Sequence, residues 1–211
     1  MNETILGRYL VGEHLTEEEM RELTAYRQKC ITHNLEHGNS YHGSEFSPHF
    51  ESLIKKAAKK NGIDLEQRLK MKKVIELGPG GSPLAKDFLD LGVSGYFGVE
   101  PFVPDLTKQM LPKDHRVSLV PEDGLTYLLK QPDNSAIVVS FGAVCVELGG
   151  PISSLEDIRG NLEYLAFLAR EMFRVTLKGE IMISVPSSKY TDELFEDVGF
   201  RNVFGKMLWT K

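Results

Sequence analysis

The chain has 211 residues, of which 41% are hydrophobic and 26% are charged. This balance is ordinary for a soluble globular protein and excludes a disordered, collagen-like or low-complexity chain. The 25 basic and 30 acidic residues give a net charge of −5, so a general affinity for nucleic-acid phosphates is not expected. Cys30 and Cys145 lie far apart in the chain, which excludes a disulfide scaffold and fits a reducing compartment.

No apolar segment approaches the roughly 20 residues that a membrane-spanning helix needs. The N-terminal segment lacks both the basic and the apolar region of a signal peptide. We therefore predict a cytoplasmic protein without a membrane span.

The first part of the chain is predicted to be helical. Thr16 and Glu19 have the spacing of a capping box, which begins a helix. Apolar residues then recur with a helical period until the polar segment 38–46, which is expected to be a loop. A second helix is expected to begin near residue 47 and to end at Asn61-Gly62.

A basic segment lies at the end of this second helix and beyond it. Residues 55–73 contain eight lysines and arginines against two acidic residues, a net charge of +6. We interpret it as a solvated helix face followed by a basic linker. The alternative is a contact for an acidic substrate or for RNA phosphates, which the absence of interleaved aromatic residues disfavours.

From residue 72 onward, short apolar segments alternate with helical segments. This alternation is typical of a parallel sheet with helices on both faces. Strands are expected at residues 72–77, 95–100, 116–120, 135–141 and 180–185. The tail should form a short helix that Gly199 ends, and at least one more strand. The predicted fold class is α/β, a doubly wound and mainly parallel sheet, with residues 1–70 as an N-terminal helical extension and 71–211 as one α/β domain.

The first predicted strand runs into a glycine-rich turn within the segment VIELGPGGSP, residues 74–83. We call the part that begins at Gly78 the glycine turn. A helix is expected to follow, with Ser82 as its cap and Pro83 in its first position. Glycines permit a tight turn and a close approach of a ligand, and a helix N-terminus offers free N–H groups. Pro83 departs from the dinucleotide pattern G-x-G-x-x-G, and no Gly-Lys-Ser/Thr follows, so a phosphate-binding loop is excluded. Glu76 repels phosphate and suits an ammonium group, which favours a cationic nucleoside that carries an amino acid.

The stretch V-I-E-L-G-P-G-G resembles motif I of the class I S-adenosylmethionine-dependent methyltransferases. That motif places an acid between two apolar residues and continues with G-x-G-x-G; Ser82 stands here at the third glycine position. The resemblance implies a Rossmann-like sheet of the seven-stranded type. It also implies S-adenosylmethionine as the cofactor, bound near Glu76, Gly78, Pro79 and Gly80.

Further residues fall where that family binds its cofactor. Glu100 ends the second strand, and the resemblance implies that it accepts hydrogen bonds from the ribose hydroxyls, although an acid there would also suit a nicotinamide dinucleotide. Asp123 and Gly124 follow the third strand, where the resemblance implies contacts with the adenine amino group and a ring nitrogen. Ser140 ends the fourth strand, beside the expected position of the methyl donor.

The segment after the fourth strand argues against two subclasses of methyltransferase. Residues 140–143, SFGA, lack the Asn/Asp-Pro-Pro-Tyr/Phe of methyltransferases that act on adenine or glutamine amino groups. Cys145 lacks the preceding proline of the cytosine C5 enzymes, and we interpret it as a small buried residue.

Two histidine-containing segments are weighed separately. His33 and His37 lie in an H-x-x-E-H pattern, as in some zinc proteases, but no third ligand is evident and no metal site is predicted. Tyr41 and His42 lie in the glycine-flanked loop 38–46. His42 is a candidate general base and Tyr41 a candidate for orienting the acceptor or covering the cofactor. A plain connecting loop is the alternative.

The sequence therefore predicts an S-adenosylmethionine-dependent methyltransferase that acts on a small-molecule acceptor. The alternatives are a non-catalytic S-adenosylmethionine-binding sensor or scaffold, and a methyltransferase that acts on RNA or protein. A nicotinamide-dependent oxidoreductase is disfavoured by Pro83.

Overall fold

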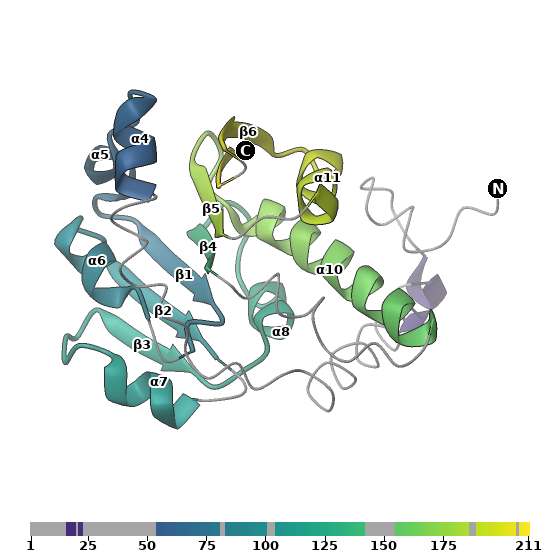
Figure 1. The fold of residues 1–211 in the computed structure, drawn as a ribbon. Coiled ribbons are helices and arrows are strands. Elements are labelled where there is room, and N and C mark those ends of the chain that lie inside the picture. The colour runs from purple at the N-terminus through teal and green to yellow at the C-terminus, as the bar shows by residue number, and fades with distance from the viewer. Residues whose placement is uncertain are drawn as a thin grey trace.

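The computed structural model describes residues 16–19, 21–22, 54–80, 83–100, 104–141, 155–185, 189–205 and 207–211. These residues contain one seven-stranded sheet, with the strand order β3-β2-β1-β4-β5-β7-β6 (Figure 1). The strands are β1 (Lys73–Leu77), β2 (Gly95–Val99), β3 (Val117–Val120), β4 (Ile137–Phe141), β5 (Ile181–Val185), β6 (Arg201–Phe204) and β7 (Leu208–Thr210).

The first five strands are parallel, whereas β7 runs antiparallel to both β5 and β6. The strand order reverses direction between β1 and β4, which is the place where open α/β sheets bind their ligands. The predicted doubly wound, mainly parallel sheet is thereby confirmed.

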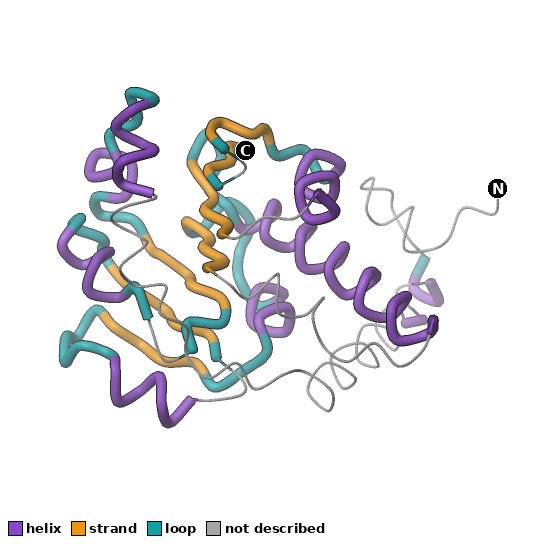
Figure 2. The backbone as a smooth tube through the Cα atoms, viewed as in Figure 1, coloured by secondary structure: helices purple, strands orange, loops and turns teal. Residues whose placement is uncertain are grey.

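Helices cover both faces of the sheet, which Figure 2 shows as strands between two groups of helices. One core cluster contains apolar residues of α4 (Lys56–Lys60), α5 (Leu65–Leu69) and α6 (Ala85–Asp90). The other contains apolar residues of α8 (Gly124–Leu129), α10 (Leu155–Val175) and α11 (Lys189–Asp197). The helix α7 (Pro104–Met110) lies beside β3.

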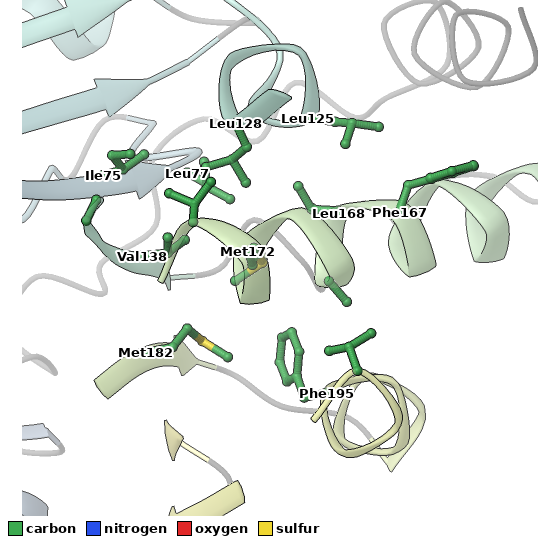
Figure 3. Close-up of a cluster of buried hydrophobic side chains, with 14 of the residues drawn as sticks. Ile75, Leu77, Leu125, Leu128, Val138, Phe167, Leu168, Met172, Met182 and Phe195 are labelled. Atoms are coloured by element: carbon green, nitrogen blue, oxygen red, sulfur yellow. The ribbon is translucent and has the colours of Figure 1, made fainter. Parts of the chain in front are cut away.

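The strands at the centre of the sheet are buried on both faces. Ile137, Val138 and Val139 of β4 are completely buried, although their side chains alternate between the two faces. Val138 belongs to the cluster of α8, α10 and α11, and its two neighbours belong to the opposite cluster. Figure 3 shows how the cluster of α8, α10 and α11 joins these helices to the sheet through side chains such as Ile75, Leu77, Val138, Leu125, Leu128, Leu168, Met172 and Phe195. The continuous apolar segments of the sequence are therefore strands that are covered by helices on both faces.

The N-terminal capping box is confirmed. The Thr16 N–H donates to Glu19 Oε2 at 2.8 Å, and the Glu19 N–H donates to Thr16 Oγ1 at 3.2 Å. Residues 17–19, 21 and 22 are helical, and the remainder of that predicted helix and the loop 38–46 lie outside the described residues.

Two element boundaries differ from the prediction. The basic segment contains a second short helix, α5, whose N-cap is Asp64: its carboxylate accepts from the Gln67 N–H at 3.0 Å. The helix α6 begins at Ala85 rather than at Pro83. Its first turn takes its acceptor from β1, as described below, and Ser82 lies outside the described residues.

Residues before β1 share a core with the α/β domain. Ile54, Ala58, Leu65 and Leu69 are buried in the same cluster as Val74. The division of the chain at residues 70 and 71 stays a prediction. Among the described residues, no helix is long and apolar enough to cross a membrane.

Candidate functional site

The carboxyl ends of five parallel strands meet in one row. Leu77 of β1 pairs with Val99 of β2 on one side and with Ser140 of β4 on the other. Val99 pairs in turn with Val120 of β3, and Ser140 pairs with Ser184 of β5. This row forms one edge of the sheet and includes the point where the strand order reverses.

The residues predicted to bind a cofactor gather along this edge. Gly78 and Glu100 come directly after β1 and β2, and Asp123 follows β3 by three residues. Ser140 lies in the row itself and is 1% exposed. Residues that are far apart in the sequence thus lie together at the carboxyl ends of the strands.

The glycine turn has a backbone that requires glycine at two positions. Gly78 has a φ of 63° and Gly80 a φ of 53°, both in the left-handed region that residues with a Cβ avoid. The Gly78 N–H donates to the Val99 carbonyl at 2.9 Å, which ties the start of the turn to β2. Pro79 between them is buried, and a Cβ on Gly98 would lie 3.3 Å from Pro79 Cγ. The turn therefore packs tightly on β2.

Glu100 binds the glycine turn directly. Its Oε2 accepts from the Gly80 N–H at 2.9 Å, and the residue is only 3% exposed. The carboxylate thus lies beside the part of the turn that a ligand would approach. Its two oxygens together have about four lone-pair positions, so a carboxylate there can accept several hydrogen bonds at once.

Thr107 holds the same glycine from the opposite side. Its hydroxyl donates to the Gly80 carbonyl at 2.6 Å, and the residue is completely buried. Nothing in the sequence near Thr107 marks it for this role, because its partner lies 27 residues earlier.

Glu76 lies in β1, two residues before Gly78, and one of its oxygens accepts two hydrogen bonds. Its Oε2 accepts from the Leu84 N–H at 3.0 Å and from the Tyr96 hydroxyl. The Leu84 N–H lies at the start of α6, where the sequence predicted that Ser82 would be the acceptor. Glu76 is the acceptor instead. Burial raises the pKa of Glu76 from 4.5 to about 7, although both hydrogen bonds favour the charged form. The carboxylates of Asp87 and Glu100 add to this upward shift of the pKa.

Asp123 caps α8 at the end of β3. Its Oδ1 accepts from the Thr126 N–H at 3.1 Å, and the residue is 8% exposed. Gly124 is the first residue of that helix, and a Cβ there would lie 3.3 Å from Leu77 Cδ2. A glycine at this position lets α8 begin close to β1.

The remaining predicted residues are not placed by the structure. Tyr41, His42, His33, His37 and Cys145 all lie outside the described residues. Within the described ranges, no group of three or more histidine, cysteine, aspartate or glutamate side chains could hold a metal ion.

The basic segment lies apart from this edge. Arg68 and Lys72 form ion pairs with Glu180, which precedes β5 and therefore lies at the opposite, amino end of the strands. An open depression between α4 and α5 is lined by Lys55, Lys59, Gly62, Ile63, Asp64 and Leu65. None of these residues belongs to the glycine turn or to the acids around it, so we do not assign this depression to the site.

Similar folds occur among solved structures. A precorrin-8w decarboxylase from Methanobacterium thermoautotrophicum matches with a TM-score of 0.51 and 19% identity, over 78% of this chain and 78% of that chain. The cyclase SpnF matches with a TM-score of 0.51 and 13% identity, over 88% of this chain and 73% of that chain. An S-adenosylmethionine-dependent methyltransferase from Archaeoglobus fulgidus has a TM-score of 0.47 and 15% identity, over 75% and 76% of the two chains.

The described sheet and these similarities show a class I, Rossmann-like methyltransferase fold. No family model and no curated protein sequence matches the chain. Because the identities are low and the first two neighbours are named for a decarboxylation and a cyclisation, the fold by itself does not define the reaction.

The left-handed backbone of Gly80 makes a prediction for the protein without ligand. Gly80→Val should lower the free energy of unfolding by about 1–2 kcal/mol, because a β-branched residue is strained at positive φ. Gly80→Asn should cost less, since asparagine enters the left-handed region more readily. Urea unfolding of both variants measures the difference. If asparagine destabilises the protein as much as valine, steric contact rather than φ accounts for the glycine.

Proposed function

We propose that the protein is a cytoplasmic methyltransferase that binds S-adenosylmethionine at the carboxyl edge of its sheet and methylates a small-molecule acceptor. The observation that carries this proposal is the convergence of the glycine turn with Glu76, Glu100 and Asp123 on one edge of a methyltransferase fold. The wide separation of the two cysteines favours the reducing compartment.

The residues present fit this cofactor. The turn has no Cβ at Gly78 and Gly80, so a ligand can approach its backbone closely. Glu100 offers a buried carboxylate to the two ribose hydroxyls, and Asp123 offers one to an adenine amino group. Carboxylates at this edge favour a cationic ligand and repel the phosphates of a dinucleotide.

When bound, S-adenosylmethionine would supply an activated methyl group, which an acceptor atom takes in line while the electron pair of the broken S–CH₃ bond stays on the sulfur of S-adenosylhomocysteine. The protein's task is then to orient the two reactants and to exclude water. Glu100 and the glycine turn would fix the nucleoside end, and Ser140 in the middle of the edge would lie near the reacting end. The assignment of the acceptor's general base to His42, with Tyr41 as its neighbour, stays a sequence prediction.

A small-molecule acceptor agrees better with the charge distribution than RNA does. Two of the eight basic residues of segment 55–73 are engaged by Glu180, and a third, Lys73, donates to Gln131 at 2.7 Å. The single carboxylate of Glu180 offsets one of these positive charges, and the three contacts lie at the edge opposite to the acids.

A ligand panel separates the proposed function from its rivals. S-adenosylmethionine and S-adenosylhomocysteine should raise the melting temperature, whereas NAD and ATP should not; saturation at about 100 times Kd corresponds to about 2.7 kcal/mol. Stabilisation by NAD alone would favour an oxidoreductase. Incubating the S-adenosylmethionine complex with a metabolite extract then tests catalysis: formation of S-adenosylhomocysteine distinguishes an enzyme from a sensor.

Asp123 provides a test in which stability and binding separate. Asp123→Asn keeps an oxygen that can cap α8 but replaces the second oxygen with an amide NH₂, which cannot accept from adenine. We expect an unchanged melting temperature and an affinity for S-adenosylhomocysteine about tenfold lower. Asp123→Ala should lose both, with about 1 kcal/mol of stability lost with the cap. Full affinity in the asparagine variant would assign Asp123 to the helix cap alone.

A further inference from the structure

The peptide groups on both sides of Gly80 are held by different elements. The Gly80 N–H donates to the carboxylate of Glu100, which directly follows β2, at 2.9 Å. The Gly80 carbonyl accepts from the hydroxyl of Thr107, in the middle of α7, at 2.6 Å. The Thr107 side chain is completely buried, and without its hydroxyl the partly buried Gly80 carbonyl would lose this partner.

This arrangement matters because glycine itself determines little about the conformation of the turn. Gly78 and Gly80 both have positive φ, and glycine populates positive and negative φ about equally. The orientation of the peptide groups therefore depends on external partners. A turn held in one orientation loses less conformational entropy when a ligand binds against its backbone.

We propose that Thr107 is a positioning residue of the cofactor site: its hydroxyl holds the Gly80 carbonyl toward α7 and thereby keeps the glycine turn in its ligand-receiving conformation. This inference rests on the proposed function, since it names a further residue for the same site. Thr107 acts through Gly80 and is not itself a contact to the ligand. The helix α7 thus joins the site although its sequence, PDLTKQM, carries no binding motif.

Two substitutions separate the hydroxyl from the packing of Thr107. Thr107→Val keeps the shape and the buried methyl but removes the hydroxyl. Thr107→Ser keeps the hydroxyl and removes the methyl. If packing were the role of Thr107, valine would be tolerated and serine would not; the proposed hydrogen bond requires the reverse.

Thr176 offers a matched control in the same protein. It is also completely buried, and its hydroxyl also donates to a carbonyl at 2.6 Å, that of Met172. It pairs with Ala136, just before β4, at the amino end of the strands and away from the glycine turn. Thr176→Val therefore removes a buried threonine hydroxyl and its hydrogen bond away from the site, although the Met172 carbonyl keeps the bond from the Thr176 N–H at 3.0 Å.

Calorimetric titration with S-adenosylhomocysteine measures the effect well below the melting temperature. We expect Thr107→Val to raise Kd about fivefold with unchanged stoichiometry, and Thr107→Ser and Thr176→Val to stay within about twofold of the unmodified protein. An unchanged Kd in Thr107→Val, or an equal loss in Thr107→Ser, would overturn the inference. An equal loss in Thr176→Val would show a general effect of stability.

A second measurement keeps this inference distinct from the proposed function. If the unmodified protein does not bind S-adenosylhomocysteine, the proposed function fails, and amide hydrogen exchange still tests the role of Thr107. The amides of Gly78 and Gly80 should exchange faster in Thr107→Val than in the unmodified protein, Thr107→Ser or Thr176→Val. Identical exchange in all four proteins would show that Thr107 does not hold the turn.

Discussion

Replacing Glu100 with alanine should weaken the binding of S-adenosylhomocysteine by about 10- to 100-fold. A hydrogen bond to a charged group contributes roughly 1.5–3 kcal/mol, which corresponds to that range of affinity. Glu100 is expected to serve the ligand and also holds the Gly80 N–H, so the alanine variant loses a ligand contact and a support of the turn together. Titration calorimetry at constant pH and ionic strength measures the change.

Two further variants interpret this result. Glu100→Gln keeps one carbonyl oxygen for the Gly80 N–H and loses acceptor capacity, so its affinity should fall between those of alanine and the unmodified protein. Glu122→Ala removes a negative charge from the same region, where Glu122 is paired with Lys130, and should bind normally. If Glu100→Ala also binds normally, the acid after β2 does not serve the ligand.

The stability of the protein should fall as the pH rises from about 5 to 8, and Glu76→Gln should remove much of this fall. Glu76 is 1% exposed and its pKa is raised from 4.5 to about 7, chiefly by burial. Between these two values the folded state keeps a proton that the unfolded state has lost, so raising the pH favours unfolding. Above about pH 8 both states are ionised and the penalty stays constant. The pKa difference corresponds to a penalty on the order of 3 kcal/mol.

Urea unfolding of both proteins at several pH values tests this expectation. Glutamine retains an oxygen that can accept from the Leu84 N–H and the Tyr96 hydroxyl, the two donors that Glu76 binds, but it does not titrate. The two proteins should differ little at pH 5, and the glutamine variant should be more stable at pH 8. Other titrating groups affect both proteins equally, so parallel curves would show that Glu76 titrates normally. If Glu76 also faces an ammonium group of the ligand, the more stable variant should bind more weakly.

The alternation of strands and helices could be predicted because burial leaves a local record in the sequence. Strands such as 137–141 and 181–185 lie between helices on both faces, so nearly every position is apolar. The capping box of Thr16 and Glu19 is equally local, since both partners are three residues apart. The acids Glu100 and Asp123 could be placed at one edge because parallel strands bring their carboxyl ends together.

The missed features depend on partners that are distant in the sequence. The start of α6 was assigned to Ser82, but the acceptor for Leu84 comes from Glu76, eight residues earlier and in another element. Thr107 lies 27 residues from the glycine that it holds, and no local pattern connects them. The helix α5 is only five residues long, too short for a periodic signal, although Asp64 at its start is a typical N-cap.

A crystal structure of the protein with S-adenosylhomocysteine tests most directly whether the carboxyl edge of the sheet is the cofactor site. We expect the ribose hydroxyls within hydrogen-bond distance of Glu100, the adenine amino group beside Asp123, and the amino-acid end against the turn at Gly78 and Gly80. A ligand seated elsewhere, such as the depression between α4 and α5, or crystals that bind no ligand at saturating concentration, would contradict the assignment.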